Sequence, residues 1–361
     1  GLMLAAAPLA TAPLYAQPAK TAAYKAPRLS YGQPSLEGYW TNGSLTTETR
    51  PAKFGDRLVM TPEEVRQEES DAAKLAVSDN GDIDPNAPAP SVGGDLPAGQ
   101  TQFSGAGGNV GGYDRGWLDP GASVMRVGGE PRTSFLTTPN GRPPARKAGP
   151  APAAGGRGAP PPAAAARGAT FSAFDNPETR GAGERCLTSF GRNTPPPMLP
   201  NGFYNNNYQI VQSPNAVAIV TEMVHDARII PLAANKTSAK HRTDGVRPYF
   251  GDSIGWWEGD TLVVETTNYP RSQAYNGSWE NLKVTERFTR TAKDRLRYKY
   301  TIEDNTTWDA PWGGEYEFAP LDGIMYEYAC HEGNYALEGI LAGAREGERV
   351  AAEQARGRAA R

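Results

Sequence analysis

The residues with the clearest potential for chemistry are a histidine and two carboxylates that lie among β-forming residues. His225 and Asp226 are adjacent, and Glu286 lies on a strand face that is otherwise apolar. A carboxylate on such a face needs a partner or a raised pKa, and buried ionisable groups often mark functional sites. His225 with Glu286 or Asp226 could therefore serve as acid and base in a hydrolase, lyase or isomerase. Glu286 could equally form a structural ion pair with Arg287 or Arg228.

The expected orientation of His225 depends on one strand that runs without interruption through residues 216–231. Because side chains alternate between the two faces of a strand, His225 would point inward, with Glu222 and Arg228 on the outer face. An inward histidine can act as a general base or a metal ligand, although a histidine hydrogen-bonded within a core is commoner. The sequence leaves the catalytic and the structural role of His225 open.

Aromatic residues crowd the last third of the chain and favour a second kind of site. Core packing explains most of them, but so many rings in a small barrel would also form a flat-walled cavity for aromatic, terpenoid or sugar rings. The expected ligand-binding residues are Arg228, Trp256, Trp257, Tyr298, Tyr300 and Tyr326. The leading functional prediction is an exported β-barrel protein that binds a small apolar or aromatic ligand, and the enzyme is the alternative.

Other partners receive no support from the sequence. The three histidines, His225, His241 and His331, form no close pair of the kind that zinc sites use, so no metal is expected. No glycine loop has the strand and helix that nucleotide binding requires, and no cofactor is expected. The formal net charge of -3 offers no basic field for nucleic acid. The partner expected is a small-molecule ligand, and the oligomeric state is not predicted.

Alternating β-rich runs predict the fold. They cover residues 207–211, 216–231, 254–269, 282–291, 295–303 and 324–330. Turn residues at 257–260 and 292–294 predict hairpins, and sequential hairpins favour an up-and-down antiparallel arrangement. Because an open sheet edge invites aggregation, the strands should close. We expect an all-β, antiparallel, up-and-down, lipocalin-like barrel with N-terminal extensions, a short helix and a C-terminal helix.

The composition divides the chain into five parts. Residues 1–16 are expected to be a signal peptide, because their apolar run is too short to span a bilayer. Residues 17–141 form an N-terminal extension with loops, short strands and a helix that begins after a capping-box pattern at Thr61. Residues 142–168, rich in Pro, Ala and Gly, read as a disordered linker. Residues 169–341 form the barrel and residues 342–361 a helical tail.

The two cysteines fit an exported protein. An oxidising compartment favours a disulfide between Cys186 and Cys330, worth roughly 4 to 5 kcal/mol in the chain-entropy model. No apolar stretch after the signal is long enough to cross a membrane. The expected location is periplasmic or secreted.

Several segments carry a resemblance to a known family. They are Glu222–Arg228, Gly251–Thr266, Glu286–Arg290 and Tyr326–Tyr335. They resemble a large family of exported bacterial proteins with a W-E-G-D-T-L-V-V core, an E-R-F-T-R strand and a closing Y-E-Y-A-C-H-E-G-N-Y motif. The resemblance covers nearly the whole mature chain, except for the Pro/Ala insertion and for residues 236–246, which replace a short D-G-R-x-H turn and leave His241 displaced. It implies export and a β fold, and no particular reaction.

Overall fold

The computed structural model describes residues 24–79, 119–147, 174–200, 202 and 205–359. The large sheet consists of β1 (Gly38–Thr41), β4 (Asn207–Gln212), β5 (Ala216–Thr221), β6 (Ala227–Pro231), β7 (Asp252–Glu258), β8 (Thr261–Thr267), β9 (Lys283–Ala292), β10 (Arg295–Glu303) and β11 (Trp312–Pro320). The predicted signal peptide, and the predicted linker from residue 148 onward, lie outside the described residues.

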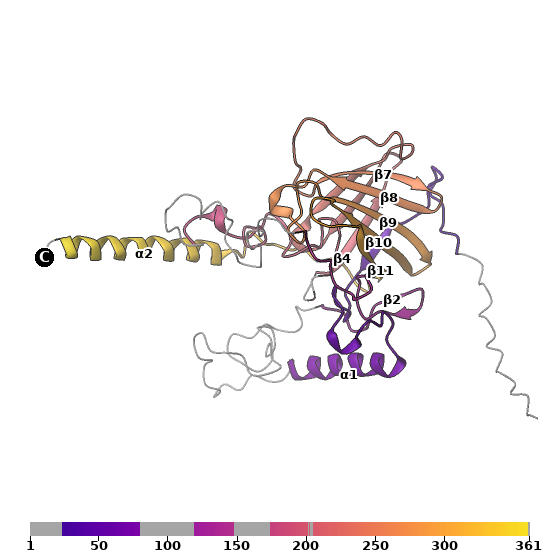
Figure 1. The fold of residues 1–361 in the computed structure, drawn as a ribbon, viewed down its shortest axis with the longest axis horizontal. Helices are drawn as coiled ribbons and strands as arrows, with labels where there is room; N and C mark the ends of the chain where they lie inside the picture. Colours follow the sequence, from indigo (N-terminus) through magenta and orange to yellow (C-terminus); the bar gives the residue numbers. More distant parts are fainter. Residues whose placement is uncertain (1–23, 80–118, 148–173, 201, 203–204, 360–361) are drawn as a thin grey trace, which may run out of the picture.

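One antiparallel sheet dominates the molecule, as predicted (Figure 1). Its nine strands follow the order β6-β5-β4-β1-β11-β10-β9-β8-β7. Strands next to each other along the chain are also neighbours in the sheet, except that β1 lies between β4 and β11 and that β6 and β7 lie at the two edges. The predicted boundary at residue 169 therefore divides a single sheet, because the N-terminal part of the chain supplies one of its central strands.

The two edge strands of the sheet, β6 and β7, approach each other without forming a ladder. They meet at a single parallel bridge between Leu232 and Gly255, where the Ala233 N–H donates to the Gly255 carbonyl at 2.8 Å. A ring of nine strands cannot be antiparallel throughout, because each antiparallel step reverses the strand direction and nine is odd. A side chain at Gly255 would meet Leu232 at 3.0 Å, so glycine permits the approach. The two edges therefore come close at one point, but the described strands form no closed barrel.

The residue pattern predicted the hairpins β7–β8 and β9–β10 but missed two features. The run 216–231 is not one strand, because β5 and β6 are separated by a tight turn in which Val224 and His225 adopt left-handed φ angles of 60° and 46°. The predicted strand at 324–330 is wrong, since this segment forms no strand. The last strand is instead β11. Its sequence did not predict a strand, because Gly313 and Gly314 lower the β-propensity of this segment.

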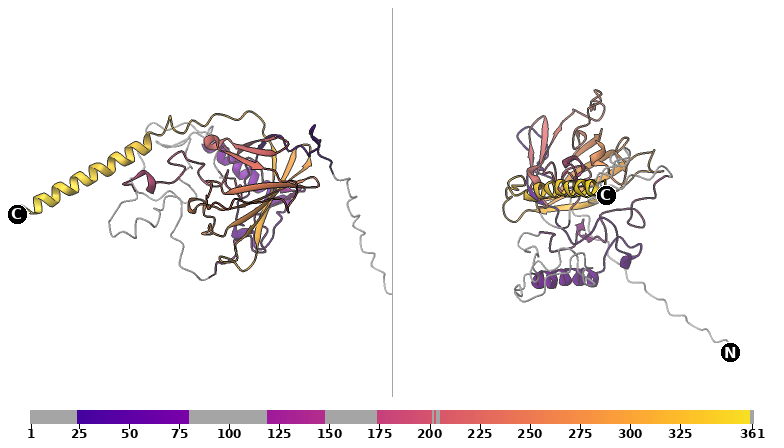
Figure 2. Two further views of the ribbon diagram at one scale, coloured as in Figure 1. Left: turned by 90° about the horizontal axis from the view of Figure 1, so that it is seen from above. Right: turned by 90° about the vertical axis from the view of Figure 1, so that its left-hand side faces the viewer.

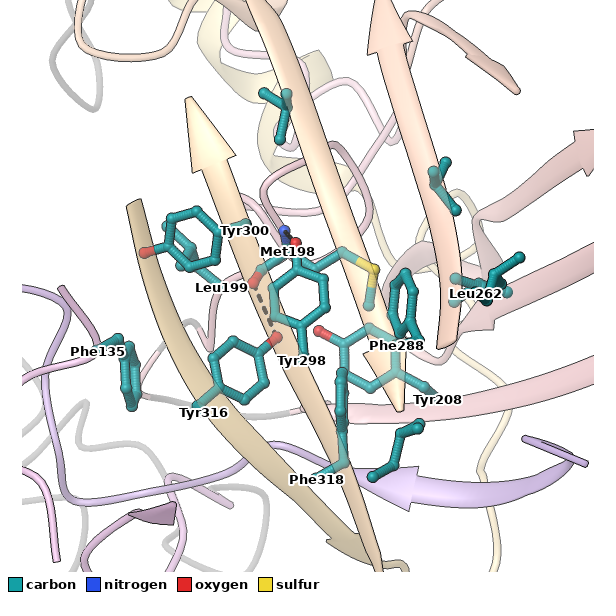
Figure 3. Close-up of a cluster of buried hydrophobic side chains, with 14 of the residues drawn as sticks. Phe135, Met198, Leu199, Tyr208, Leu262, Phe288, Tyr298, Tyr300, Tyr316 and Phe318 are labelled. Atoms are coloured by element: carbon teal, nitrogen blue, oxygen red, sulfur yellow. Dashed lines mark hydrogen bonds between the residues drawn. The ribbon is translucent and has the colours of Figure 1, made fainter. Parts of the chain in front are cut away.

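The concave side of the sheet is filled by the protein's own chain (Figure 3). Met198 lies among the aromatic rings of β9, β10 and β11 and is almost completely buried. Its N–H donates to the Tyr298 hydroxyl at 2.8 Å, and its carbonyl accepts from the Tyr316 hydroxyl at 2.8 Å. Two core tyrosines thus bind the backbone N–H and carbonyl of one residue that follows a run of prolines, so these interior side chains face protein rather than an open cavity.

The remaining elements extend from this body (Figures 1 and 2). Helix α1 (Pro62–Asp79) begins at the predicted capping box, in which the Thr61 hydroxyl accepts from the Glu64 N–H and the Glu64 carboxylate from the Thr61 N–H. A small hairpin pairs β2 (Arg126–Val127) with β3 (Glu130–Pro131). Helix α2 (Tyr335–Ala359) leads away from the sheet. Neither helix has the length and apolar character needed to cross a bilayer.

Candidate functional site

Glu286 is part of a buried ion pair. Its side chain is 0 % exposed, and the Arg228 guanidinium, 3 % exposed, approaches its two carboxylate oxygens to 3.1 and 2.9 Å. The Tyr298 hydroxyl donates to the same carboxylate at 2.9 Å. Burial and the negative charge of Glu286 raise the pKa of Tyr298 well above its ordinary value, so this tyrosine stays protonated and remains a donor. The pairing of Glu286 with Arg228 is the structural alternative that the sequence allowed.

The predicted inward orientation of His225 is wrong. His225 is exposed, and its Nδ1 lies 3.3 Å from the Tyr328 carbonyl. The turn between β5 and β6 interrupts the alternation that the prediction assumed. Arg228 and Ile230 therefore face inward, and Glu222 in the turn is buried rather than exposed. The structure does not bring His225 and Glu286 to one space.

Asp226 has a structural position. Its carboxylate accepts hydrogen bonds from the Thr188 hydroxyl at 2.7 Å, the Ser189 N–H at 3.1 Å and the Thr194 hydroxyl at 3.3 Å. These bonds attach the segment that leads to Met198 to the end of β6. Burial raises the pKa of Asp226, although the three hydrogen bonds oppose the shift. All three donors bind Oδ2 of the carboxylate and belong to residues 188–194.

The predicted ligand-binding aromatic residues occupy three different environments. Tyr298 and Tyr300 are buried in the core, where Tyr298 contacts Met198. Trp256 is buried and donates to Glu258 at 2.9 Å, and Trp257 is half-buried against the main cluster. Tyr326 is exposed and lies outside the sheet. These rings do not line one common cavity.

A groove outside the sheet brings together segments that are far apart in the sequence. It has a volume of about 890 Å³. One side is formed at the end of the sheet where β4 begins and β5 ends, and another by residues 183–190. Residues 321–340, including the first turns of α2, form the remaining side. Tyr326 is the one predicted ligand-binding residue in its lining.

Two of its walls are joined covalently by the predicted disulfide. Cys186 and Cys330 are bonded, with their Cα atoms 5.7 Å apart, and both line the groove. Beside them the Asn334 side-chain amide donates to the Glu184 carbonyl at 2.8 Å. Since residues 322–333 are mostly exposed and form no strand, the disulfide and a few hydrogen bonds fix this wall in place.

Glu222 is the most unusual residue in the groove. It is 3 % exposed, yet its carboxylate receives only two N–H donors, from the Asn207 side chain and the Tyr326 backbone, both at 2.7 Å. Within the described ranges no Lys, Arg or His lies within ion-pair distance of it. The Oδ1 of Asn207 is buried and has no hydrogen-bond partner. Burial, together with the nearby Glu222 charge, raises the pKa of Asp119.

Sequence reasoning missed this groove, although it singled out two of its parts. The segments Glu222–Arg228 and Tyr326–Tyr335 both carry the family resemblance, and they converge here. The signal in the sequence was that the motif segment Tyr326–Tyr335 contains Cys330, which the expected disulfide attaches to Cys186. It was lost because Glu222 was assigned to the outer face and 324–330 to a strand.

No family model, no curated protein and no solved structure matches this chain. The arrangement of the described residues therefore carries the functional argument. Among them, no three His, Cys, Asp or Glu side chains gather in a way that could hold a metal ion.

Proposed function

We propose that this protein binds a small organic molecule in the groove beside the Cys186–Cys330 disulfide. The observation that carries the proposal is the groove itself, because a volume of about 890 Å³ lies within the range of roughly 300 to 1,000 Å³ found for small-molecule sites. The filled interior of the sheet argues against a site there. The sequence predicted a ligand site inside the sheet, whereas the site proposed here lies at the end of the sheet.

The apolar part of the lining favours an apolar or aromatic ligand body. Phe190, Ile324 and Tyr326 are exposed in the groove, and Leu337 and Ile340 on α2 are half-buried. Exposed apolar side chains that gather in a concavity are characteristic of binding sites, because a ligand removes their surface from water. Each methylene-sized group so covered contributes about 0.8 kcal/mol.

Export to the periplasm or the cell exterior is part of this proposal, and so is membership in the resembling family. The disulfide supports export, because such bonds persist in oxidising compartments. A lipocalin-like closure of the sheet is likewise proposed, supported by the single bridge between its two edge strands, β6 and β7.

A neutral fluorescent probe tests the proposal. Naphthylethanol should bind saturably to the full chain, at one site, in a fluorescence titration. Ile324→Ser should weaken its affinity about threefold or more, because Ile324 is 66 % exposed within the groove. The matched control is Ile229→Ser, since Ile229 is 59 % exposed on β6, away from the groove lining. Equal affinities for the two variants, or no saturable binding, would overturn the proposed function.

A further inference from the structure

We infer that the ligand of this groove carries a positively charged nitrogen, held by Glu222 and Asn207. The inference rests on the proposed function and assigns the chemical class of its ligand, an organic ammonium with an apolar or aromatic body. Glu222 and Asn207 offer hydrogen-bond acceptors and a negative charge, and among the residues that the structure describes no cation lies within ion-pair distance of Glu222.

The two buried glutamates, Glu286 and Glu222, differ in the charge of their partners. Glu286 and Glu222 are almost equally inaccessible, at 0 % and 3 % exposure. Glu286 has the Arg228 guanidinium at 2.9 Å, whereas Glu222 has only two neutral N–H donors. Because an unpaired buried charge is costly, an uncompensated carboxylate in the wall of a groove marks a place where a cation is stabilised.

The rest of the lining has the same sign. Five carboxylate side chains line the groove, and its lining contains no Lys, Arg or His. They are Asp119, Glu184, Glu222, Asp322 and Glu327. In the part of the chain that the structure describes, only Glu184 among them has an ion-pair partner, Arg180 at 2.6 Å. A groove with low-polarity walls and one sign of charge concentrates ligands of the opposite charge.

An independent observation comes from Asn207. Its side chain is 7 % exposed and lines the groove, and its Nδ2 donates to Glu222 at 2.7 Å. The Oδ1 has no partner, although a buried acceptor without a hydrogen bond costs about 1 to 3 kcal/mol. An ammonium group has several N–H donors and no acceptor, so it matches this amide oxygen and the Glu222 carboxylate together. The Tyr326 ring in the same lining could add a cation–π contact.

The experiment compares three probes that share a naphthyl body: naphthylethylammonium, neutral naphthylethanol and anionic naphthylpropanoate. On the wild-type chain at neutral pH, the ammonium should bind at least tenfold more tightly than the alcohol, and the carboxylate most weakly. Glu222→Gln should remove most of the preference for the ammonium and leave the affinity for the alcohol within about twofold. Glu332→Gln is the matched control, because Glu332 is exposed near the disulfide but does not line the groove.

The outcomes separate the two proposals. If none of the probes binds, the proposed function fails. If the alcohol binds as tightly as the ammonium, or Glu222→Gln and Glu332→Gln reduce the preference equally, the groove binds ligands but the assignment of a cation is overturned. Should Glu222→Gln not fold, Asp119→Asn at the same groove replaces it and should reduce the preference at least threefold, while an unchanged preference would count against the inference.

Discussion

A buried carboxylate has a cationic partner in the sheet interior and only neutral donors in the groove. In the interior, Glu286 has a guanidinium and a tyrosine hydroxyl, and the space beside it is occupied by Met198. In the groove, Glu222 has no cation, and the apolar side chains around it are exposed. Glu286, the group most suggestive of chemistry in the sequence, thus has a cation of the protein's own beside it, although Glu286 Oε2 and the Nε and Nη1 of Arg228 have no hydrogen bond. The group that is left incomplete is the better candidate for a ligand.

The largest effect is expected from breaking the interior pair. Arg228→Ala leaves a buried, unpaired Glu286 and should lower the free energy of unfolding by about 3 to 5 kcal/mol in urea denaturation. Arg287→Ala is the control, because its ion pair with Glu258 is exposed and should contribute less than about 1 kcal/mol. Similar losses for the two variants would show that the interior pair has no special structural role.

The sequence predicted the interior better than the groove for a physical reason. Residues Leu296, Tyr298, Tyr300 and Ile302 alternate along a single regular strand, so their inward direction follows from local geometry. The groove depends on the left-handed turn at Val224 and His225, which changes the face of every residue after it. Val224 and His225 do not predict such a turn, because glycine and asparagine are the residues that favour the left-handed conformation.

Long-range assembly explains the other errors. β1 pairs with β4 across more than a hundred and sixty residues, and no local pattern specifies that pairing (Gly38 with Ile210). The segment 324–330 has the composition of a strand, yet its disulfide and its bond to Glu222 attach it outside the sheet. The disulfide itself was predictable, because only two cysteines exist to form it.

The second largest effect is expected from removal of the disulfide, which should change the groove more than the sheet interior. Cys186→Ser with Cys330→Ser removes a link across 144 residues and should cost about 2 to 5 kcal/mol. The core tyrosines lie in the sheet, so near-ultraviolet circular dichroism of the folded variant should stay close to wild type. Affinity for naphthylethanol should fall at least fivefold, since the wall 322–333 is released. Unchanged affinity would mean that hydrogen bonds alone hold the groove.

The pH dependence of the binding affinity should differ between the cationic and the neutral probe. Burial and Glu222 raise the pKa of Asp119, so in the folded chain this carboxyl binds a proton more readily than in the unfolded chain. Its unfavourable contribution to stability is therefore absent at low pH, grows as pH rises from the unfolded to the folded pKa, and is fully present above. A bound cation favours the ionised form and offsets this cost.

Affinity for naphthylethylammonium should accordingly rise about tenfold between pH 4 and neutral pH, about 1.4 kcal/mol, while affinity for naphthylethanol stays level. The titratable side chains that line the groove are Asp119, Glu184, Glu222, Asp322 and Glu327, so Asp119→Asn should reduce the slope without abolishing it. A parallel rise for both probes would indicate a pH-dependent change of the groove itself.

The smallest effect is expected at His225, which the sequence made the leading catalytic candidate. His225 is exposed, and its ring is hydrogen-bonded to the Tyr328 carbonyl at 3.3 Å, so replacing the ring should disturb the buried core little. Asparagine is the informative replacement, because it tolerates the left-handed φ of 46° that alanine would adopt only with strain. His225→Asn should change the free energy of unfolding by less than about 0.5 kcal/mol and the affinity for naphthylethylammonium by less than twofold.

If this variant instead lost binding while its urea midpoint held, the ligand site would extend past Tyr328 to the β5–β6 turn. The site beside the unpaired Glu222 would then include His225, whereas the ion-paired Glu286 would stay outside it.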